Sequence, residues 1–215
     1  MKLPRLNHVI LIFIIALFAI NVAANLSVPF FAVFILQDIG AAFTVVGFAS
    51  AVYWITKSIL QLPVARWLDK NHGEIDDYYS LVCGLAVSTL GVFLFYLAEE
   101  VWHIYVLQFL IAIGDAFVVP PFYAIFTRHL DPNNEGFEWS LYSSFSLGAG
   151  SALGGALAGI LASTIGIRPL FLMNGTLMLL GLVILLFLKP YIRPKVPMRV
   201  GWVFLEQKRA GGGAR

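Results

Sequence analysis

The sequence predicts an all-α membrane protein with six transmembrane helices and both termini in the cytoplasm. Three observations support this fold class. First, 60% of the 215 residues are hydrophobic and only 12% are charged, which is about half the charge of a typical soluble domain. Second, the apolar residues form six long runs. Third, the basic residues gather on one side of the membrane that these runs define.

Each of the six runs is long enough to cross a bilayer, which takes ~20 mostly apolar residues. Four runs carry no charge, and two carry one each: Lys57 in the second run and Asp115 in the fourth. Buried helices of soluble proteins seldom stay apolar over such lengths, so we reject that alternative. The predicted helices cover approximately residues 8–36, 42–64, 79–98, 102–126, 139–163 and 169–188, within a transmembrane domain of residues 1–192.

The two ends of the chain need separate interpretation. Lys2 and Arg5 precede the first run, as in a signal peptide, but the apolar stretch continues to Leu36. That is too long for the core of a signal peptide, so we expect a retained helix. Residues 193–215 contain prolines, many basic residues and a glycine-rich end, which predicts a basic, flexible cytoplasmic tail.

The distribution of Lys and Arg predicts the orientation. With six helices, both termini lie on one side, and 12 of the 14 basic residues fall on that side. Arg168 falls on the other side, and Lys57 lies within a helix. Because cytoplasmic loops of membrane proteins are rich in Lys and Arg, we place both termini in the cytoplasm. A multi-pass protein of the plasma (inner) membrane is the expected location.

The two halves of the predicted bundle are related by an internal repeat. Residues 28–34 (VPFFAVF) and 120–126 (PPFYAIF) share four identical positions and two conservative ones, at an offset of 92 residues. The same offset superposes the second helix on the fifth and the third on the sixth. Three helices per repeat then run in opposite directions through the membrane, which predicts a 3+3 inverted repeat.

After the second helix, Asp69, Lys70 and Gly73 follow the pattern Gly-x-x-x-Asp-Arg/Lys-x-Gly, although Ala65 replaces the first Gly and Gly73 comes one residue late. This loop is the first of three motifs that resemble patterns of the major facilitator superfamily (MFS). In the family, this aspartate helps to latch two six-helix halves together on the cytoplasmic side. The resemblance therefore implies the N-terminal six-helix half of an MFS fold.

The other two motifs lie on the fourth and fifth helices. Gly114 matches the second glycine of the family pattern Arg-x-x-x-Gly-x-Gly, and Gln108 stands where that pattern has its arginine. Gly150, Gly154 and Gly155 resemble the glycine motif of antiporters, with Ser151 in place of its proline. Small residues at this spacing also let helices approach closely. We expect helix packing from Gly148, Gly150, Gly154, Gly155 and Gly159.

Polar residues within the predicted helices are the candidates for function, because a charge at bilayer depth costs roughly 2.5–3.5 kcal/mol. Lys57 and Asp115 lie at equal depth, which permits an ion pair. The other candidates for a substrate or proton path are Asn21, Asn25, Tyr53, Gln61, Gln108 and Tyr142. The alternative is that these groups only hold helices together.

The predicted function is that of a half-size MFS-like secondary transporter, which moves a small solute by alternating access. It would work as a homodimer or with a separately encoded second half. The alternatives are a non-transporting scaffold or accessory subunit and a truncated MFS remnant. The sequence does not identify the substrate. The net charge of +2 gives no reason to expect nucleic acid. We expect no enzyme, cofactor or metal site, and the partners are the lipid bilayer, the solute and a second half.

Overall fold

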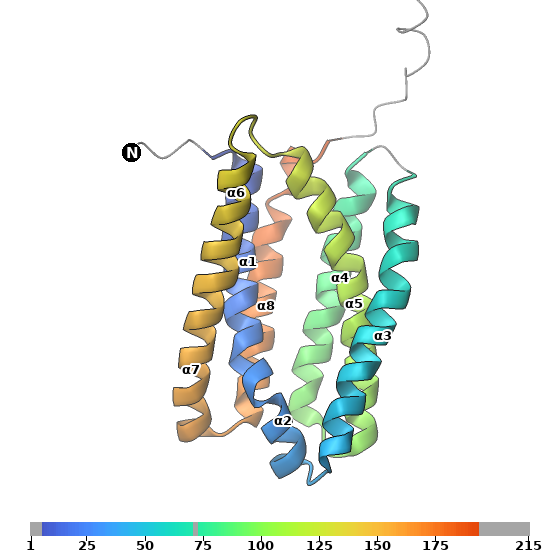
Figure 1. The fold of residues 1–215 in the computed structure, drawn as a ribbon, viewed down its shortest axis with the longest axis vertical. Coiled ribbons are helices and arrows are strands. Elements are labelled where there is room, and N and C mark those ends of the chain that lie inside the picture. Colours follow the sequence, from blue (N-terminus) through green and yellow to red (C-terminus); the bar gives the residue numbers. More distant parts are fainter. Residues whose placement is uncertain (1–5, 71–72, 194–215) are drawn as a thin grey trace, which may run out of the picture.

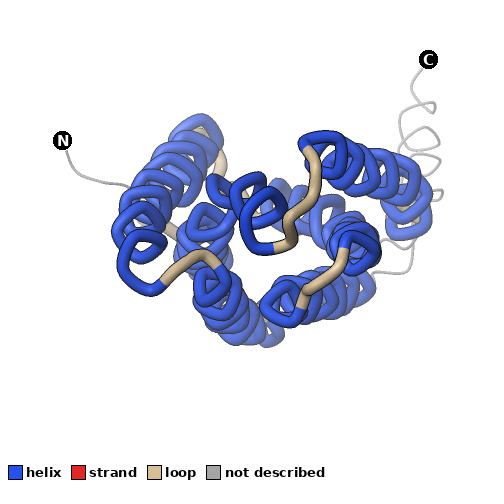
Figure 2. The backbone as a smooth tube through the Cα atoms, turned by 90° about the horizontal axis from the view of Figure 1, so that it is seen from below, coloured by secondary structure: helices blue, strands red, loops and turns tan. Residues whose placement is uncertain are grey.

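The structure is a computed structural model that describes residues 6–70 and 73–193. The predicted tail lies outside the described residues, apart from Arg193. The described residues form helices joined by short connections and contain no strand (Figures 1 and 2). The described residues contain six helices that are long and apolar enough to span a membrane, so the predicted all-α architecture of six spans is confirmed.

The described residues form six helical spans that run along the bundle, and several spans consist of more than one segment. Their segments are α1 (His8–Ser27), η1 (Val28–Phe30), α2 (Phe31–Val33) and η2 (Phe34–Asp38); α3 (Phe43–Leu68); α4 (Ile75–Leu94) and η3 (Phe95–Leu97); α5 (Val101–Arg128); α6 (Glu135–Leu141), η4 (Tyr142–Ala149) and α7 (Gly150–Ile165); and α8 (Arg168–Leu186) and η5 (Lys189–Tyr191).

Several helices begin earlier than a search for uncharged runs predicts. The third span starts at Ile75 rather than at residue 79, with Asp76 and Asp77 in its first turn. The fifth starts at Glu135 rather than at residue 139. Carboxylates are favoured in a first turn because the helix dipole is positive there. The helices therefore continue into charged sequence that an apolarity criterion excludes.

Prolines at matching positions of the two repeats have different effects. In the first span, the α-helix gives way to a 3₁₀ turn at Val28–Phe30, which contains Pro29. The fourth span stays α-helical through Pro120 and Pro121. Pro121 cannot donate to the carbonyl of Phe117, and that oxygen instead accepts a hydrogen bond from Ser80 Oγ of α4 at 2.8 Å. A side chain thus replaces the missing backbone donor.

The arrangement of the spans separates inner helices from edge helices. The first span packs against α7 and α8, and α5 packs against α3 and α4. Figure 1 shows α7 at one edge of the bundle and α3 at the other. The edge helices bury little: Ala49, Val64 and Leu68 are the buried residues of α3. Their large exposed side chains, such as Ile55 and Leu62, suit contact with lipid or another helix.

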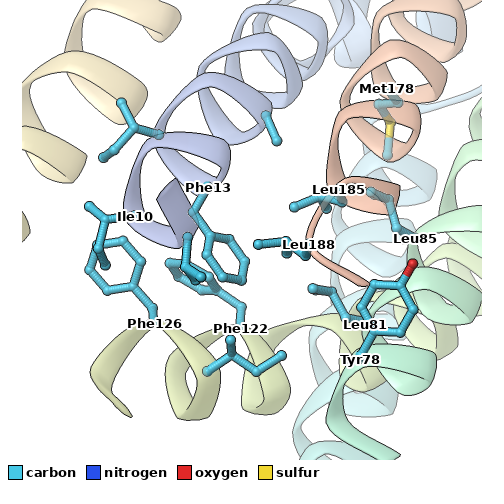
Figure 3. Close-up of a cluster of buried hydrophobic side chains, with 14 of the residues drawn as sticks. Ile10, Phe13, Tyr78, Leu81, Leu85, Phe122, Phe126, Met178, Leu185 and Leu188 are labelled. Atoms are coloured by element: carbon cyan, nitrogen blue, oxygen red, sulfur yellow. The ribbon is translucent and has the colours of Figure 1, made fainter. Parts of the chain in front are cut away.

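Two aromatic clusters join the repeats, one toward each end of the bundle. In the first, the ring centroid of Phe13 on α1 lies 5.4 Å from that of Phe122 and 5.9 Å from that of Phe126, both on α5 (Figure 3). In the second, the ring centroid of Phe171 on α8 lies 4.8 Å from that of Phe34 and 5.2 Å from that of Phe95. Rings at these separations stabilise the contact beyond simple area burial.

We call the end of the bundle where α3 and α5 terminate the basic end, after Arg66, Lys70 and Arg128. Figure 1 shows the first and last described residues at this same end. The side chain of Arg128 pairs here with Asp77 of α4 at 2.5 Å. Because Asp77 is only 2% exposed, this partner keeps a buried carboxylate from lying uncompensated.

Candidate functional site

Three helices bring four polar side chains together midway along the fourth span. Asp115 of α5 accepts hydrogen bonds at both carboxylate oxygens. Tyr53 of α3 donates its hydroxyl to Oδ2 at 2.5 Å, and Ser88 of α4 donates to Oδ1 at 2.7 Å. Lys57 donates from Nζ to the hydroxyl oxygen of Tyr53 at 3.2 Å. We call Tyr53, Lys57, Ser88 and Asp115 the polar network.

The sequence predicted Asp115, Lys57 and Tyr53 as candidates, and the structure joins them differently from the expected ion pair. Among the described residues, Lys57 and Asp115 form no direct salt bridge. The phenol of Tyr53 stands between the ammonium and the carboxylate and bonds to both. Tyr53 and Lys57 are one helical turn apart, so both side chains lie on the same face of α3.

Ser88 is the member of the polar network that sequence reasoning missed. It lies on the third span, in a run with no charge. It reaches Asp115 because α4 and α5 touch through Gly84 and Gly114. A Cβ built on Gly84 would lie 2.6 Å from the carbonyl oxygen of Gly114, so only glycines allow this approach. In the sequence, a glycine on each of two adjacent spans, Gly84 and Gly114, is the signal that could have indicated this close contact.

The surroundings of Lys57 are aromatic. Its Nζ lies 5.2 Å from the ring centroid of Trp54 and 5.4 Å from that of Tyr53, within the range in which a cation is attracted to a ring face. Lys57 itself is half-buried. Of its three N–H donors, one is used by Tyr53, and the described residues offer no partner for the other two.

Gln61 and Gln108, two further candidates for the predicted path, lie on either side of the polar network along the bundle. Gln61 is one turn beyond Lys57 toward the basic end, and it lines a cavity of about 240 Å³ together with Asp69, Asp77 and Tyr123. Gln108 is half-buried on α5, two turns from Asp115 toward the opposite end. Neither side-chain amide has a hydrogen-bond partner among the described residues, so both amides are free to bond to another molecule.

The two asparagines of α1 lie outside the polar network. Asn21 donates to the carbonyl of Leu17 at 2.7 Å, within its own helix. Asn25 donates to the carbonyl of Asn21 and to Ser151 Oγ of α7, both at 2.9 Å. The bond to Ser151 matches the alternative role of holding helices together.

Tyr142 also has aromatic neighbours rather than polar ones. Its ring centroid lies 5.3 Å from that of Phe122 and 5.9 Å from that of Trp139, and no hydrogen bond of its hydroxyl occurs within the described residues. The structure therefore puts it in the aromatic cluster near the basic end.

The five glycines of the fifth span have two kinds of surroundings. A Cβ on Gly154 would lie 2.4 Å from the carbonyl oxygen of Val22, and one on Gly150 would lie 3.1 Å from Cβ of Asn21. Both glycines therefore let the fifth span approach α1. A Cβ built on any of the remaining three, Gly148, Gly155 and Gly159, would meet no neighbouring helix of the described residues within 4 Å.

The loop motif lies at the basic end. Asp69 is the C-cap residue of α3 and is exposed, as is Lys70, whereas Gly73 is buried. The described residues contain no group of three or more His, Cys, Asp or Glu that could hold a metal ion.

Comparisons with known proteins place these observations in a family. The family model described as Major Facilitator Superfamily matches residues 11–203. Among solved structures, the chain is similar to the POT family transporter PepTSo, with a TM-score of 0.73 and 15% sequence identity. The match covers 90% of this chain but 40% of that chain, so this chain spans less than half of PepTSo. No curated protein matches the chain.

Proposed function

The chain belongs to the Major Facilitator Superfamily, and we propose that it forms one half of a secondary transporter that moves a small solute by alternating access. The polar network is the observation that carries this proposal. Lys57 and Asp115 bring two ionisable groups to mid-membrane depth, where charges are costly and usually serve transport or proton transfer.

The geometry of the polar network suits a coupled site. Asp115 is held by two donors, and one of them, Tyr53, is shared with Lys57. A proton that neutralised Asp115 would weaken both bonds to it, because hydrogen bonds to a charged group are the stronger ones. The position of the Tyr53 phenol, and with it the freedom of Lys57, would then depend on the charge of Asp115.

A second half is part of the proposal. The edge helices α3 and α7 bury few side chains within this chain, and family members relate two six-helix halves by an axis along the membrane normal. A homodimer would supply such an axis, and a two-fold dimer is the commonest closed assembly. A separately encoded half would serve equally. Exposed Gly148 and Gly159 would then meet helices of the partner.

We place the basic end in the cytoplasm, in a plasma (inner) membrane, because Lys and Arg concentrate there. Asp69 and Lys70 would lie at this face, where the family loop latches the two halves.

The proposal is tested by measuring the mass of the purified protein in nanodiscs and the solute uptake of proteoliposomes. We expect a two-copy, twelve-helix assembly that takes up at least one compound from a panel of organic acids, amines, sugars and short peptides. A monomer at every concentration that takes up none of them would contradict a self-sufficient transporter. It would leave a missing second half, a scaffold or a remnant.

A further inference from the structure

The hydrogen-bonding capacity of the polar network is unevenly used. Both carboxylate oxygens of Asp115 already accept hydrogen bonds from side chains of this chain. Lys57, by contrast, keeps two N–H donors without a partner among the described residues, in a half-buried position. These free donors belong to a cation, so they suit an acceptor that carries negative charge.

We propose that the solute carries a carboxylate group and that the ammonium of Lys57 binds it. This inference rests on the proposed function and names the substrate class of the same site. A single ammonium balances a single negative charge, which favours a monocarboxylate over a polyanion. An amine would bring a second positive charge next to the ammonium of Lys57. It would also have to share the carboxylate of Asp115 with Tyr53 and Ser88. A neutral solute would leave the charge of Lys57 uncompensated at bilayer depth, which is costly.

The surroundings of Lys57 suit a solute whose remaining part is apolar or aromatic. Trp54 is 61% exposed, and its ring flanks the ammonium at 5.2 Å. A flat apolar group attached to the carboxylate could rest on this ring while the carboxylate contacts Nζ. Stacking of this kind adds to the charge contact without requiring another polar group.

The cavity at the basic end is compatible with an anionic solute. It has a volume of about 240 Å³ and reaches Gln61, one turn from Lys57. Two acidic residues line it. Asp77 has its charge balanced by Arg128 at 2.5 Å, and Asp69 is exposed at the end of α3, where solvent screens its charge. Gln61 could donate its unused amide to the carboxylate as the solute passes.

The test compares three probes that share one ring and differ in charge: benzoate, benzamide and benzylamine. Each is titrated against the purified full chain while thermal unfolding is followed. We expect benzoate to raise the unfolding midpoint, since a ligand that binds the folded state stabilises it. Benzamide and benzylamine should have no comparable effect. Equal stabilisation by benzylamine, or no response to benzoate, would overturn the proposal.

Variants assign the effect to Lys57. In Lys57→Gln, the apparent affinity for benzoate should fall about 10- to 100-fold, the range expected for a lost hydrogen bond to a charged group. Lys57→Arg should retain part of the affinity, and Lys70→Gln, at an exposed lysine of the basic end, should be unchanged. Benzoate affinity that is unaltered in Lys57→Gln contradicts the assignment.

A second variant guards against misfolding of Lys57→Gln. Lys57→Arg keeps a cation at this position, so it should bind benzoate more tightly than Lys57→Gln does. Equally weak benzoate binding in the two variants would overturn the assignment to Lys57.

Failure of this inference is distinguishable from failure of the proposed function. Binding of benzoate that depends on Lys57, without uptake of any solute by proteoliposomes, would support the anion site and refute transport. Uptake of a sugar or an amine that is unimpaired in Lys57→Gln would support transport and refute the anion site.

Discussion

The pair of helices α3 and α5 and the pair α7 and α1 are related by the inverted repeat, yet they carry different chemistry. The 92-residue offset superposes Asp115 on Ala23 and Lys57 on Ala149. On the α7–α1 side, the contact is made by Gly154 against the backbone of Val22. On the α3–α5 side, the contact carries a carboxylate, a phenol and an ammonium.

This difference shows that the repeat conserves the packing but not the ionisable groups. One helix pair can be close and nearly apolar because its hydrogen bonds are internal to α1 or go to Ser151. The other holds charges whose insertion costs roughly 2.5–3.5 kcal/mol each before pairing. We infer that the α7–α1 pair supports the fold and that the α3–α5 pair carries the site. Each prediction below challenges one side of this comparison.

The largest effect on stability is expected at the α7–α1 contact. Gly154→Leu would force a side chain into the backbone of Val22, since even a Cβ would lie 2.4 Å from its carbonyl oxygen. We expect the free energy of unfolding to fall by about 3 kcal/mol or more. Gly155→Leu is the matched control, because a Cβ there meets nothing within 4 Å. Thermal unfolding in detergent measures both, and equal losses would refute a tight contact at Gly154.

A smaller effect on stability is expected at Ser88 of α4, which bonds to Asp115 of the α3–α5 pair. Ser88→Ala removes a hydrogen bond to the carboxylate of Asp115, and we expect a loss of about 1.5 kcal/mol together with slower uptake. Ser80→Ala removes a bond on the same helix to the neutral carbonyl of Phe117. That control should cost about 0.6 kcal/mol and leave uptake intact. A larger effect of Ser80→Ala on uptake would argue against the polar network.

The sequence predicts much of this architecture because lipid imposes a simple requirement. Each span must be about 20 apolar residues long, so six charge-free or nearly charge-free runs predict six helices. The starts of the third and fifth spans were predicted too late, because Asp76 and Glu135 belong to first turns that favour carboxylates. A criterion of uncharged sequence therefore excludes the charged first turns that the structure includes in these helices.

The candidate site could be predicted only in part. Lys57 and Asp115 stand out as charges within apolar sequence, and their shared depth follows from the helical rise. The bridging position of Tyr53 depends on how α3 packs against α5. The contribution of Ser88 depends on how closely α4 and α5 approach through Gly84 and Gly114. A serine in an apolar helix often bonds to its own backbone, so its sequence position alone does not reveal a partner on another helix.

The most direct test of the central claim compares Asp115→Asn with Asn25→Ala in solute uptake by proteoliposomes, normalised to folded protein. We expect Asp115→Asn to lose uptake by about 100-fold, the scale of a lost proton-transfer group, while its assembly stays intact. Asn25→Ala, which removes a bond between α1 and α7, should retain most of the uptake. Normal uptake in Asp115→Asn, or equal losses in the two variants, would contradict a site at the polar network of α3, α4 and α5.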